Sequence, residues 1–195
     1  MKSLIFGVLS SLLTINAWGF EVFALGTSNT NCKNAGQAYT RRLNELLVAE
    51  KISAEVINAG LNGDRPQWMM NRLEAGLKTY PNIKLVIFEP GPNEKFKPAN
   101  LEASGNILAH LQENKIPTIY VSNTSIQSDD EAEGFAKKYG AYYYGRWKKN
   151  IPRDNTHNQF DEGTSGGHLT VKGCELWAEN MLPLVLQVMK EKNIR

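Results

Sequence analysis

Short apolar runs alternate with longer amphipathic segments along most of this chain. Five runs rich in β-branched and aromatic residues have the length of strands: 20–25, 54–57, 85–88, 118–121 and 141–144. Apolar side chains recur at helical spacing over 39–47, 69–77 and 101–111, and further helices are predicted near 131–139 and from about 171 onward. Apolar strands that alternate with helices are typical of a parallel sheet covered on both faces. The pattern predicts an α/β fold, a three-layer α/β/α sandwich with a five-stranded parallel sheet.

The first residues have the order of a secretory signal peptide. Lys2 precedes an apolar run over 4–13, which polar residues interrupt well before the roughly 20 residues that a membrane-spanning helix needs. Small residues then stand at the first and last positions of 17–19, as signal peptidase requires. We predict a signal peptide over 1–19, one domain over 20–195, a periplasmic or secreted location and no transmembrane segment after cleavage. The alternative interpretation is a buried N-terminal core segment.

Composition and charge exclude several classes of protein. The chain has 195 residues, with 22 Lys and Arg against 20 Asp and Glu, so its formal net charge is only +2. That balance excludes a strongly basic nucleic-acid-binding protein and an acidic disordered tail. Two cysteines, Cys32 and Cys174, are too few for a structural zinc knuckle and allow at most one disulfide. We expect a monomer without a nucleic-acid partner, a cofactor or a metal.

Polar residues that can do chemistry follow three of the predicted strands. Ser28 lies in a turn after the first strand and just before a predicted helix, Gly63 in a glycine-rich loop after the second, and Asn93 in a proline-stiffened turn after the third. His168 follows a glycine pair and precedes the last predicted helix. Such groups can serve as nucleophile, oxyanion donors and general base. Taken alone, each is also consistent with helix capping, turn formation or packing.

Taken together, four segments resemble the blocks of the SGNH (GDSL-type) hydrolase superfamily, in the family's order. They are Ala24-Leu25-Gly26-Thr27-Ser28, Ile57-Asn58-Ala59-Gly60-Leu61-Asn62-Gly63-Asp64, Phe88-Glu89-Pro90-Gly91-Pro92-Asn93-Glu94 and His168-Leu169-Thr170-Val171-Lys172-Gly173. The resemblance spans nearly all of the chain after residue 19 and implies the flavodoxin-like fold of that superfamily. The Asn-Ala-x-x-x-Gly-Asp loop and the compact size are most similar to the bacterial periplasmic lysophospholipase/thioesterase branch.

This resemblance implies a serine esterase mechanism. Ser28 is then the nucleophile and His168 the base. The backbone N–H groups of Ser28 and Gly63, with the side chain of Asn93, form the oxyanion hole. The physics agrees, because a serine hydroxyl is too weak an acid to attack an ester unless a base takes its proton. The implied substrate is a small-molecule, lipid or saccharide acyl ester or thioester, hydrolysed through an acyl-enzyme without metal or cofactor.

Three positions depart from the family's pattern. Thr27 and Glu94 stand where the family usually has Asp, and Ser165 occupies the place of the triad Asp, three residues before the histidine. A carboxylate there holds the imidazole in the right tautomer and stabilises the imidazolium. The ring is therefore expected to be oriented by Ser165 or a backbone carbonyl, or by a nearby carboxylate, Asp161 or Glu162. A degenerate and inactive site is the remaining alternative.

A second histidine has the spacing that the His168 block lacks. Asp154 and His157 form an Asp-x-x-His sequence. No helix start follows His157, whereas an amphipathic helix follows His168. We therefore expect His157 to be a loop residue that borders the cleft.

The two cysteines flank the candidate site in the sequence. Cys32 lies four residues after Ser28, and Cys174 lies six residues after His168. If Ser28 and His168 meet, both cysteines are expected to start helices on the same side of the sheet, within reach of a disulfide. The alternative is a pair of independent, small buried residues.

The sequence leaves the substrate open. The aromatic and cationic residues of 142–149 can hold an acyl chain, a sugar ring or an anionic head group, or they can form strand core and a solvated loop. Residues 68–70 can line an acyl pocket or pack a helix. Two enzyme functions remain: hydrolysis of a lipid or small acyl ester or thioester, and O-deacetylation of a cell-envelope or extracellular polysaccharide. The altered Asp position leaves a third alternative, a non-catalytic carbohydrate-binding or accessory protein.

Overall fold

The sheet consists of five parallel strands. A computed structural model describes residues 19–123, 125–160 and 167–195 of the chain. The strands are β1 (Phe20–Gly26), β2 (Ala54–Gly60), β3 (Ile83–Glu89), β4 (Thr118–Ser122) and β5 (Tyr142–Arg146). They pair in the order β2-β1-β3-β4-β5, and each of these pairings is parallel. The carboxyl ends of all five strands therefore meet at one edge of the sheet, where ligands bind in open α/β sheets.

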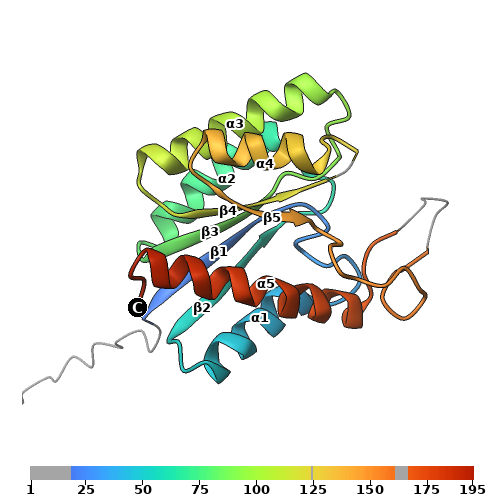
Figure 1. The fold of residues 1–195 in the computed structure, drawn as a ribbon, viewed down its shortest axis with the longest axis horizontal. Coiled ribbons are helices and arrows are strands. Elements are labelled where there is room, and N and C mark those ends of the chain that lie inside the picture. The colour runs from blue at the N-terminus through green and yellow to red at the C-terminus, as the bar shows by residue number, and fades with distance from the viewer. Residues whose placement is uncertain (1–18, 124, 161–166) are drawn as a thin grey trace, which may run out of the picture.

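Helices cover both faces of the sheet. They are α1 (Ala38–Ala49), α2 (Pro66–Thr79), α3 (Lys97–Glu113), α4 (Asp129–Lys138) and α5 (Val171–Glu191). Figure 1 shows α1 and α5 on one face and α2, α3 and α4 on the other. This arrangement confirms the predicted three-layer α/β/α sandwich, and its strand order is that of flavodoxin-like folds.

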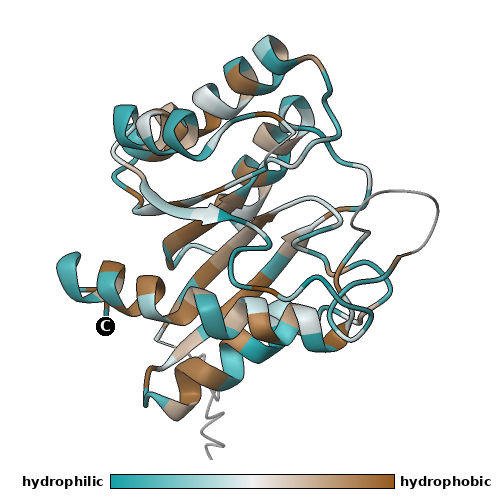
Figure 2. Cartoon of the chain, turned by 45° about the vertical axis from the view of Figure 1, so that its right-hand side comes forward, coloured by the Kyte–Doolittle hydropathy of each residue, from teal (hydrophilic) through white to brown (hydrophobic). Residues whose placement is uncertain are grey.

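Each face of the sheet has its own buried core. Successive β1 side chains point to opposite faces, so Val22 packs with α1 and α5, whereas Phe23 packs with the other three helices. On the first face Tyr39 of α1 stacks on Trp177 of α5, with ring centroids 4.0 Å apart. The strands are largely hydrophobic, and the helices carry hydrophilic residues as well (Figure 2). Burial on both faces is why β1, β3 and β4 are largely apolar runs in the sequence.

The segment after β1 differs from the prediction. The sequence predicts a helix directly after the Ser28 turn, but α1 begins only at Ala38. Residues 28–37 instead form successive turns, opened by the Asn31 N–H, which donates to the Thr27 carbonyl at 3.0 Å. Three non-glycine residues of this segment have φ values from 51° to 64°, which a right-handed helix does not contain. Ser28 therefore lies in a turn and not at the N-terminus of an α-helix.

All ten of these elements lie within the predicted domain, 20–195. The predicted signal peptide covers 1–19, and residues 1–18 lie outside the described part of the chain, as do 124 and 161–166. Within the ranges that the structure describes, no helix combines the length and hydrophobicity needed to cross a membrane.

Candidate active site

Ser28 and His168 meet at the carboxyl edge of the sheet. Ser28 lies two residues after β1, and His168 lies three residues before α5. Their side chains come together although 140 positions separate them in the chain, with His168 Nε2 at 2.8 Å from Ser28 Oγ. This is a hydrogen-bond distance, and it suits transfer of the serine proton to a neutral imidazole.

A buried carboxylate holds the turn that carries Ser28. Glu89, the last residue of β3, is only 1% exposed. Its Oε2 accepts from the Thr27 N–H at 3.0 Å, from Thr27 Oγ1 at 2.7 Å and from Thr30 Oγ1 at 3.3 Å. Its Oε1 accepts from Asn29 Nδ2 at 3.0 Å. The residues on both sides of the serine are thus bonded to one fixed group.

The charge of Glu89 depends on two opposing effects. Burial raises the pKa of the Glu89 carboxyl, and the hydrogen bonds from Thr27, Asn29 and Thr30 oppose that rise by stabilising the carboxylate. The sequence alone did not predict this role for Glu89. The sequence did contain one sign of this role: a carboxylate at the end of a strand of mostly apolar residues.

Asn93 and Gly63 belong to neighbouring loops. Asn93 lines the same cleft as Ser28, and its Nδ2 donates to the Asp64 carbonyl at 2.8 Å. Gly63 has a φ of 76° in an exposed turn and does not line that cleft. An amide has two N–H donors, so the bond to Asp64 leaves one for a substrate oxygen. The structure thus places Asn93 and Ser28 in the lining of one cleft, whereas Gly63 is outside that lining and directly precedes Asp64, which bonds to Asn93.

Hydrogen bonds hold the histidine segment beside the serine segment. An isolated antiparallel bridge pairs the backbone of Asn158 with that of Leu169, the residue after His168. Gln159 Nε2 donates to the Leu169 carbonyl at 2.5 Å and to the Lys33 carbonyl at 2.9 Å. Gln159 therefore ties the residues after the histidine to the residues after the serine.

A disulfide joins the same two segments. The structure pairs Cys32 with Cys174, with Cα atoms 6.4 Å apart, and both side chains are buried. Cys174 lies in the first turn of α5, as expected. Cys32 lies in the turns before α1, so the expectation that it starts a helix is wrong, for the same backbone reason that moves the start of α1 to Ala38.

His157 does not reach the serine. Its Nδ1 lies 2.7 Å from Asp154 Oδ1, and its carbonyl accepts from the Thr170 N–H at 3.0 Å. The next residue, Asn158, lines the Ser28 cleft, whereas His157 does not. The Asp-x-x-His sequence therefore forms a local contact within the loop.

The residues predicted to orient the imidazole are not part of the described structure. Ser165 and Asp161 lie outside the described residues, and so does Glu162. A contact on the same loop that the sequence did not indicate comes from Lys148, whose Nζ donates to the Gly167 carbonyl at 2.8 Å. Among the residues that the structure describes, no cluster of three or more His, Cys, Asp or Glu side chains is suited to a metal ion.

The Ser28 cleft has a volume of about 630 Å³, and polar and apolar atoms contribute about equally to its lining. Its apolar side chains are Pro92, Trp147 and Ile151, and its cationic ones are Lys148 and Arg153. No carboxylate belongs to the part of the lining that the structure describes. The described part of the lining therefore carries two cations and no carboxylate.

The other candidate acyl-pocket residues lie elsewhere. Met69 is fully buried in the core, and Trp68 is 57% exposed. Met70 borders a separate cavity of about 380 Å³ between α2 and α3. None of these three residues is in the described lining of the Ser28 cleft, so they do not form its acyl pocket, and only Met69 of the three is fully buried in the core.

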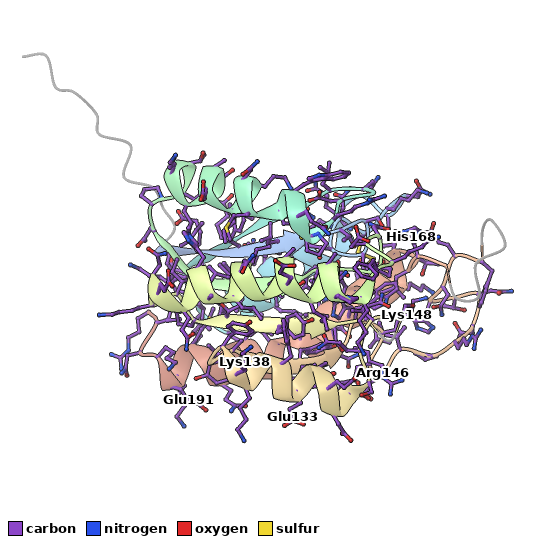
Figure 3. All side chains as sticks on the ribbon, turned by 90° about the horizontal axis from the view of Figure 1, so that it is seen from above. Glu133, Lys138, Arg146, Lys148, His168 and Glu191 are labelled. Atoms are coloured by element: carbon purple, nitrogen blue, oxygen red, sulfur yellow. A yellow bond between two sulfur atoms is a disulfide. The ribbon has the colours of Figure 1, made fainter. Side chains whose placement is uncertain are left out.

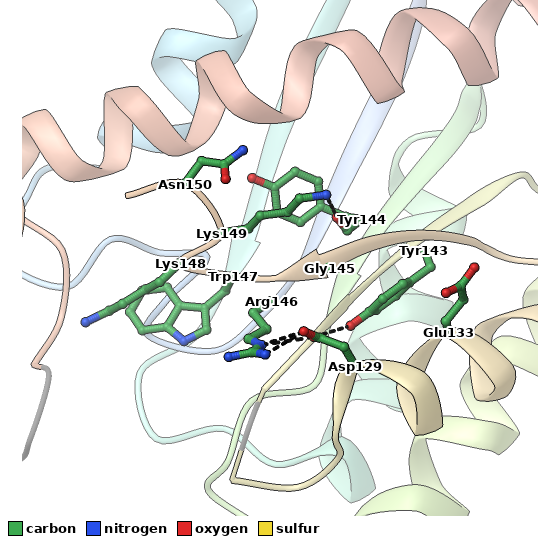
Figure 4. A pocket seen from close by; sticks show the side chains of 10 residues that line it. All are labelled: Asp129, Glu133, Tyr143, Tyr144, Gly145, Arg146, Trp147, Lys148, Lys149 and Asn150. Atoms are coloured by element: carbon green, nitrogen blue, oxygen red, sulfur yellow. Dashed lines mark hydrogen bonds and ion pairs between the residues drawn. The ribbon is translucent and has the colours of Figure 1, made fainter. Parts of the chain in front are cut away.

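A second cavity, of about 740 Å³, adjoins the segment after β5 and shares Trp147 and Lys148 with the Ser28 cleft. Its cation Arg146 is bonded to Asp129, with the guanidinium Nε 2.9 Å from Oδ2 and Nη2 2.5 Å from the same oxygen (Figure 4). The Tyr143 hydroxyl donates to Asp129 as well, at 3.0 Å. The charge of this cavity is thus partly neutralised within the protein.

Comparisons with known proteins support the fold. No family model and no curated protein matches the chain in sequence. The psychrotrophic esterase EstA from Pseudoalteromonas sp., in a structure inhibited by monoethylphosphonate, aligns with a TM-score of 0.74 at 16% identity, over 87% of this chain and 98% of that one. AlinE4, an SGNH-hydrolase family esterase, aligns with a TM-score of 0.64 at 22% identity, over 87% and 96% of the two chains. The acetyl xylan esterase AlAXEase aligns with a TM-score of 0.67 at 17% identity, over 85% and 100%. The chain therefore has the fold of the SGNH-hydrolase esterases.

Proposed function

We propose that this protein is an SGNH-type serine esterase that hydrolyses short-chain acyl esters. The observation that carries the proposal is the 2.8 Å contact between Ser28 Oγ and His168 Nε2, in a cleft at the carboxyl edge of the sheet. The order of the four sequence blocks and the likeness of the fold to esterases support it. A fold alone does not establish an activity, so the proposal depends on this pair of side chains.

The proposed reaction proceeds through an acyl-enzyme. His168 Nε2 takes the hydroxyl proton while Ser28 Oγ forms a bond to the ester carbonyl carbon. Asn93 and backbone N–H groups donate to the oxyanion, and the proton then passes to the leaving oxygen as its bond to carbon breaks. Water, activated by the same histidine, next attacks the acyl-enzyme and releases the acid. No step requires a metal or a cofactor.

The lining of the cleft supports a short acyl group on a polar alcohol. In the described part of the lining, four residues are asparagines and three have apolar side chains. The amide groups favour O-deacetylation of a saccharide as the second candidate, because sugar hydroxyls bond well to amides.

The test is hydrolysis of 4-nitrophenyl esters of increasing chain length by the wild type and by Ser28→Ala. We expect the acetate to be preferred and Ser28→Ala to lose at least about 10⁴-fold in kcat. Ser53→Ala, at the amino edge of the sheet, is the matched control and should retain activity. A fluorophosphonate should add one phosphonyl group to Ser28, seen as a mass increase of the active-site peptide. Unchanged turnover by a folded Ser28→Ala protein would sink the proposal.

We also propose that the chain is exported and cleaved after Gly19. The N-terminal pattern supports this, and so does the Cys32–Cys174 disulfide, because such bonds persist in oxidising compartments. Intact mass of protein from a periplasmic fraction or the medium should match a chain that begins at Phe20 and has no free thiol. A mass that includes Met1, or two alkylated cysteines without reduction, contradicts this proposal.

A further inference from the structure

We infer that Lys148 and Arg153 form an anion-binding subsite of the Ser28 cleft, and that the preferred ester carries a negative charge on its alcohol half. This inference rests on the proposed esterase function, since it assigns the substrate class of the same cleft. The charge can belong to a carboxylate or a phosphate, because both groups accept from an ammonium and a guanidinium.

Among the residues that the structure describes, neither cation has a negatively charged partner. Lys148 Nζ donates to Asn158 Oδ1 at 2.9 Å and to the Gly167 carbonyl at 2.8 Å, and both acceptors are neutral. Arg153 is exposed and makes no hydrogen bond or ion pair in the described ranges. Arg146 in the adjoining cavity differs, because Asp129 already binds it. In Figure 4 the amino group of Lys148 extends away from that pair.

The environment of Lys148 favours an incoming anion. The side chain is half-buried against Trp147, with Nζ 4.7 Å from the centroid of the ring. Burial, and then repulsion from Arg153, lowers the pKa of Lys148 to about 8. Two of its three N–H donors are used, so one remains for a ligand. An anion placed between the two cations would offset both their repulsion and the cost of burial.

The position of Lys148 indicates which half of the ester carries the charge. Its partner Gly167 directly precedes His168, and Figure 3 shows Lys148 and His168 at the same end of the molecule. The histidine returns its proton to the leaving oxygen, so the alcohol half must lie beside it. Asn93, the oxyanion donor, comes instead from the loop after β3. The alcohol half therefore faces the cations.

Matched esters test this inference. The first pair is 4-acetoxybenzoate and 4-acetoxybenzamide, which share an acetyl group and differ in the charge of the alcohol half. The second pair, mono-4-nitrophenyl succinate and 4-nitrophenyl butanoate, places the charge on the acyl half. 4-Acetoxyphenyl phosphate, set against 4-acetoxybenzoate, then compares phosphate with carboxylate as the anion. The measured quantity is the ratio of kcat/KM for the charged ester to that for the neutral one, at low and high salt.

We expect the wild type to prefer 4-acetoxybenzoate by about tenfold or more at low salt, and less at high salt. Lys148→Met and Arg153→Gln should each reduce that ratio, and Lys148→Arg should retain part of it. Lys84→Met removes one charge from an exposed position near the amino end of β3 and should leave the ratio unchanged.

Three outcomes overturn the inference. A wild-type ratio near one shows that the cleft does not select anions. An equal loss on both esters in Lys148→Met shows that Lys148 only holds the histidine loop. A preference confined to the succinate pair places the charge on the acyl half. If no ester shows Ser28-dependent hydrolysis, the proposed esterase function itself fails, and the two failures are thereby distinguished.

Discussion

Glu89 and Lys148 are charged groups beside the same candidate site, and the protein surrounds them differently. Neither has an oppositely charged partner in the part of the chain that the structure describes. Glu89 is 1% exposed and accepts four hydrogen bonds from fixed donors of the serine turn. Lys148 lies in the cleft wall, donates to two neutral oxygens and faces a second cation. A buried carboxylate whose two oxygens are hydrogen-bonded holds the geometry of the serine turn. An ammonium in a cleft wall with one unused N–H donor can instead bind a ligand.

The largest effect is expected from Glu89→Ala. This change leaves the buried donors of Thr27, Asn29 and Thr30 without an acceptor, and each unpaired group typically costs about 1–3 kcal/mol. We expect the free energy of unfolding to fall by about 3–5 kcal/mol. The kcat for ester hydrolysis should fall at least about 10²-fold, because the serine turn loses its alignment. Urea denaturation and steady-state kinetics measure the two effects.

Glu89→Gln is the matched control, since it keeps the size of the side chain. The Asn29 amide can turn its oxygen toward the new N–H groups, so most hydrogen bonds survive and both losses should be smaller than in Glu89→Ala. Burial raises the pKa of Glu89 above its ordinary value of 4.5. The stability that this carboxyl contributes is thus present below about pH 4.5 and lost as the pH rises through its pKa in the folded protein. The stability of the wild type relative to Glu89→Gln should decline over that range. A constant difference would show that Glu89 does not titrate within it.

The sequence predicts the strands and layers of the fold, but it does not predict the role of Glu89. Strands that are buried on both faces leave a local signal, so the five strands and the three layers were predictable. Glu89 was not, because its partners in the serine turn lie about 60 positions away. The sequence showed Thr27 where the resembling family has Asp, and only the structure shows that Glu89 supplies this turn with a carboxylate.

The turns after Ser28 were not predictable from the sequence for a different reason. Apolar periodicity detects a helix but does not mark its start when no standard cap is present. The N-cap of α1 is Gln37, a left-handed residue whose side chain makes no capping bond. By contrast, Thr170 caps α5 by accepting from the Gly173 N–H at 3.2 Å, and this helix begins where the sequence predicts.

A smaller effect is expected when a change of pH removes the charge of Lys148. The pKa of Lys148 is lowered to about 8, so this ammonium loses its charge as the pH rises through that value. The preference for 4-acetoxybenzoate over 4-acetoxybenzamide should therefore decline over the same range. Arg153 stays charged and should preserve part of the preference, while His168 acts on both esters and cancels in their ratio. Lys148→Arg should show no decline. A flat ratio in the wild type would mean that Lys148 does not bind the anion.

The smallest effect is expected from Arg146→Gln. This variant tests whether a cation near Lys148 in the sequence still attracts the anionic ester when a carboxylate of the protein already binds it. Arg146 ends β5 and Arg153 follows it, both within a few residues of Lys148, and each substitution removes one positive charge. Arg146 is an exposed side chain already bonded to Asp129, so its loss should change the ester ratio less than about twofold. Arg153 has no such partner, and its loss should reduce the ratio clearly. Equal reductions would show that the overall charge of the protein attracts the anionic ester, because a cleft subsite built from Lys148 and Arg153 requires the two arginines to differ.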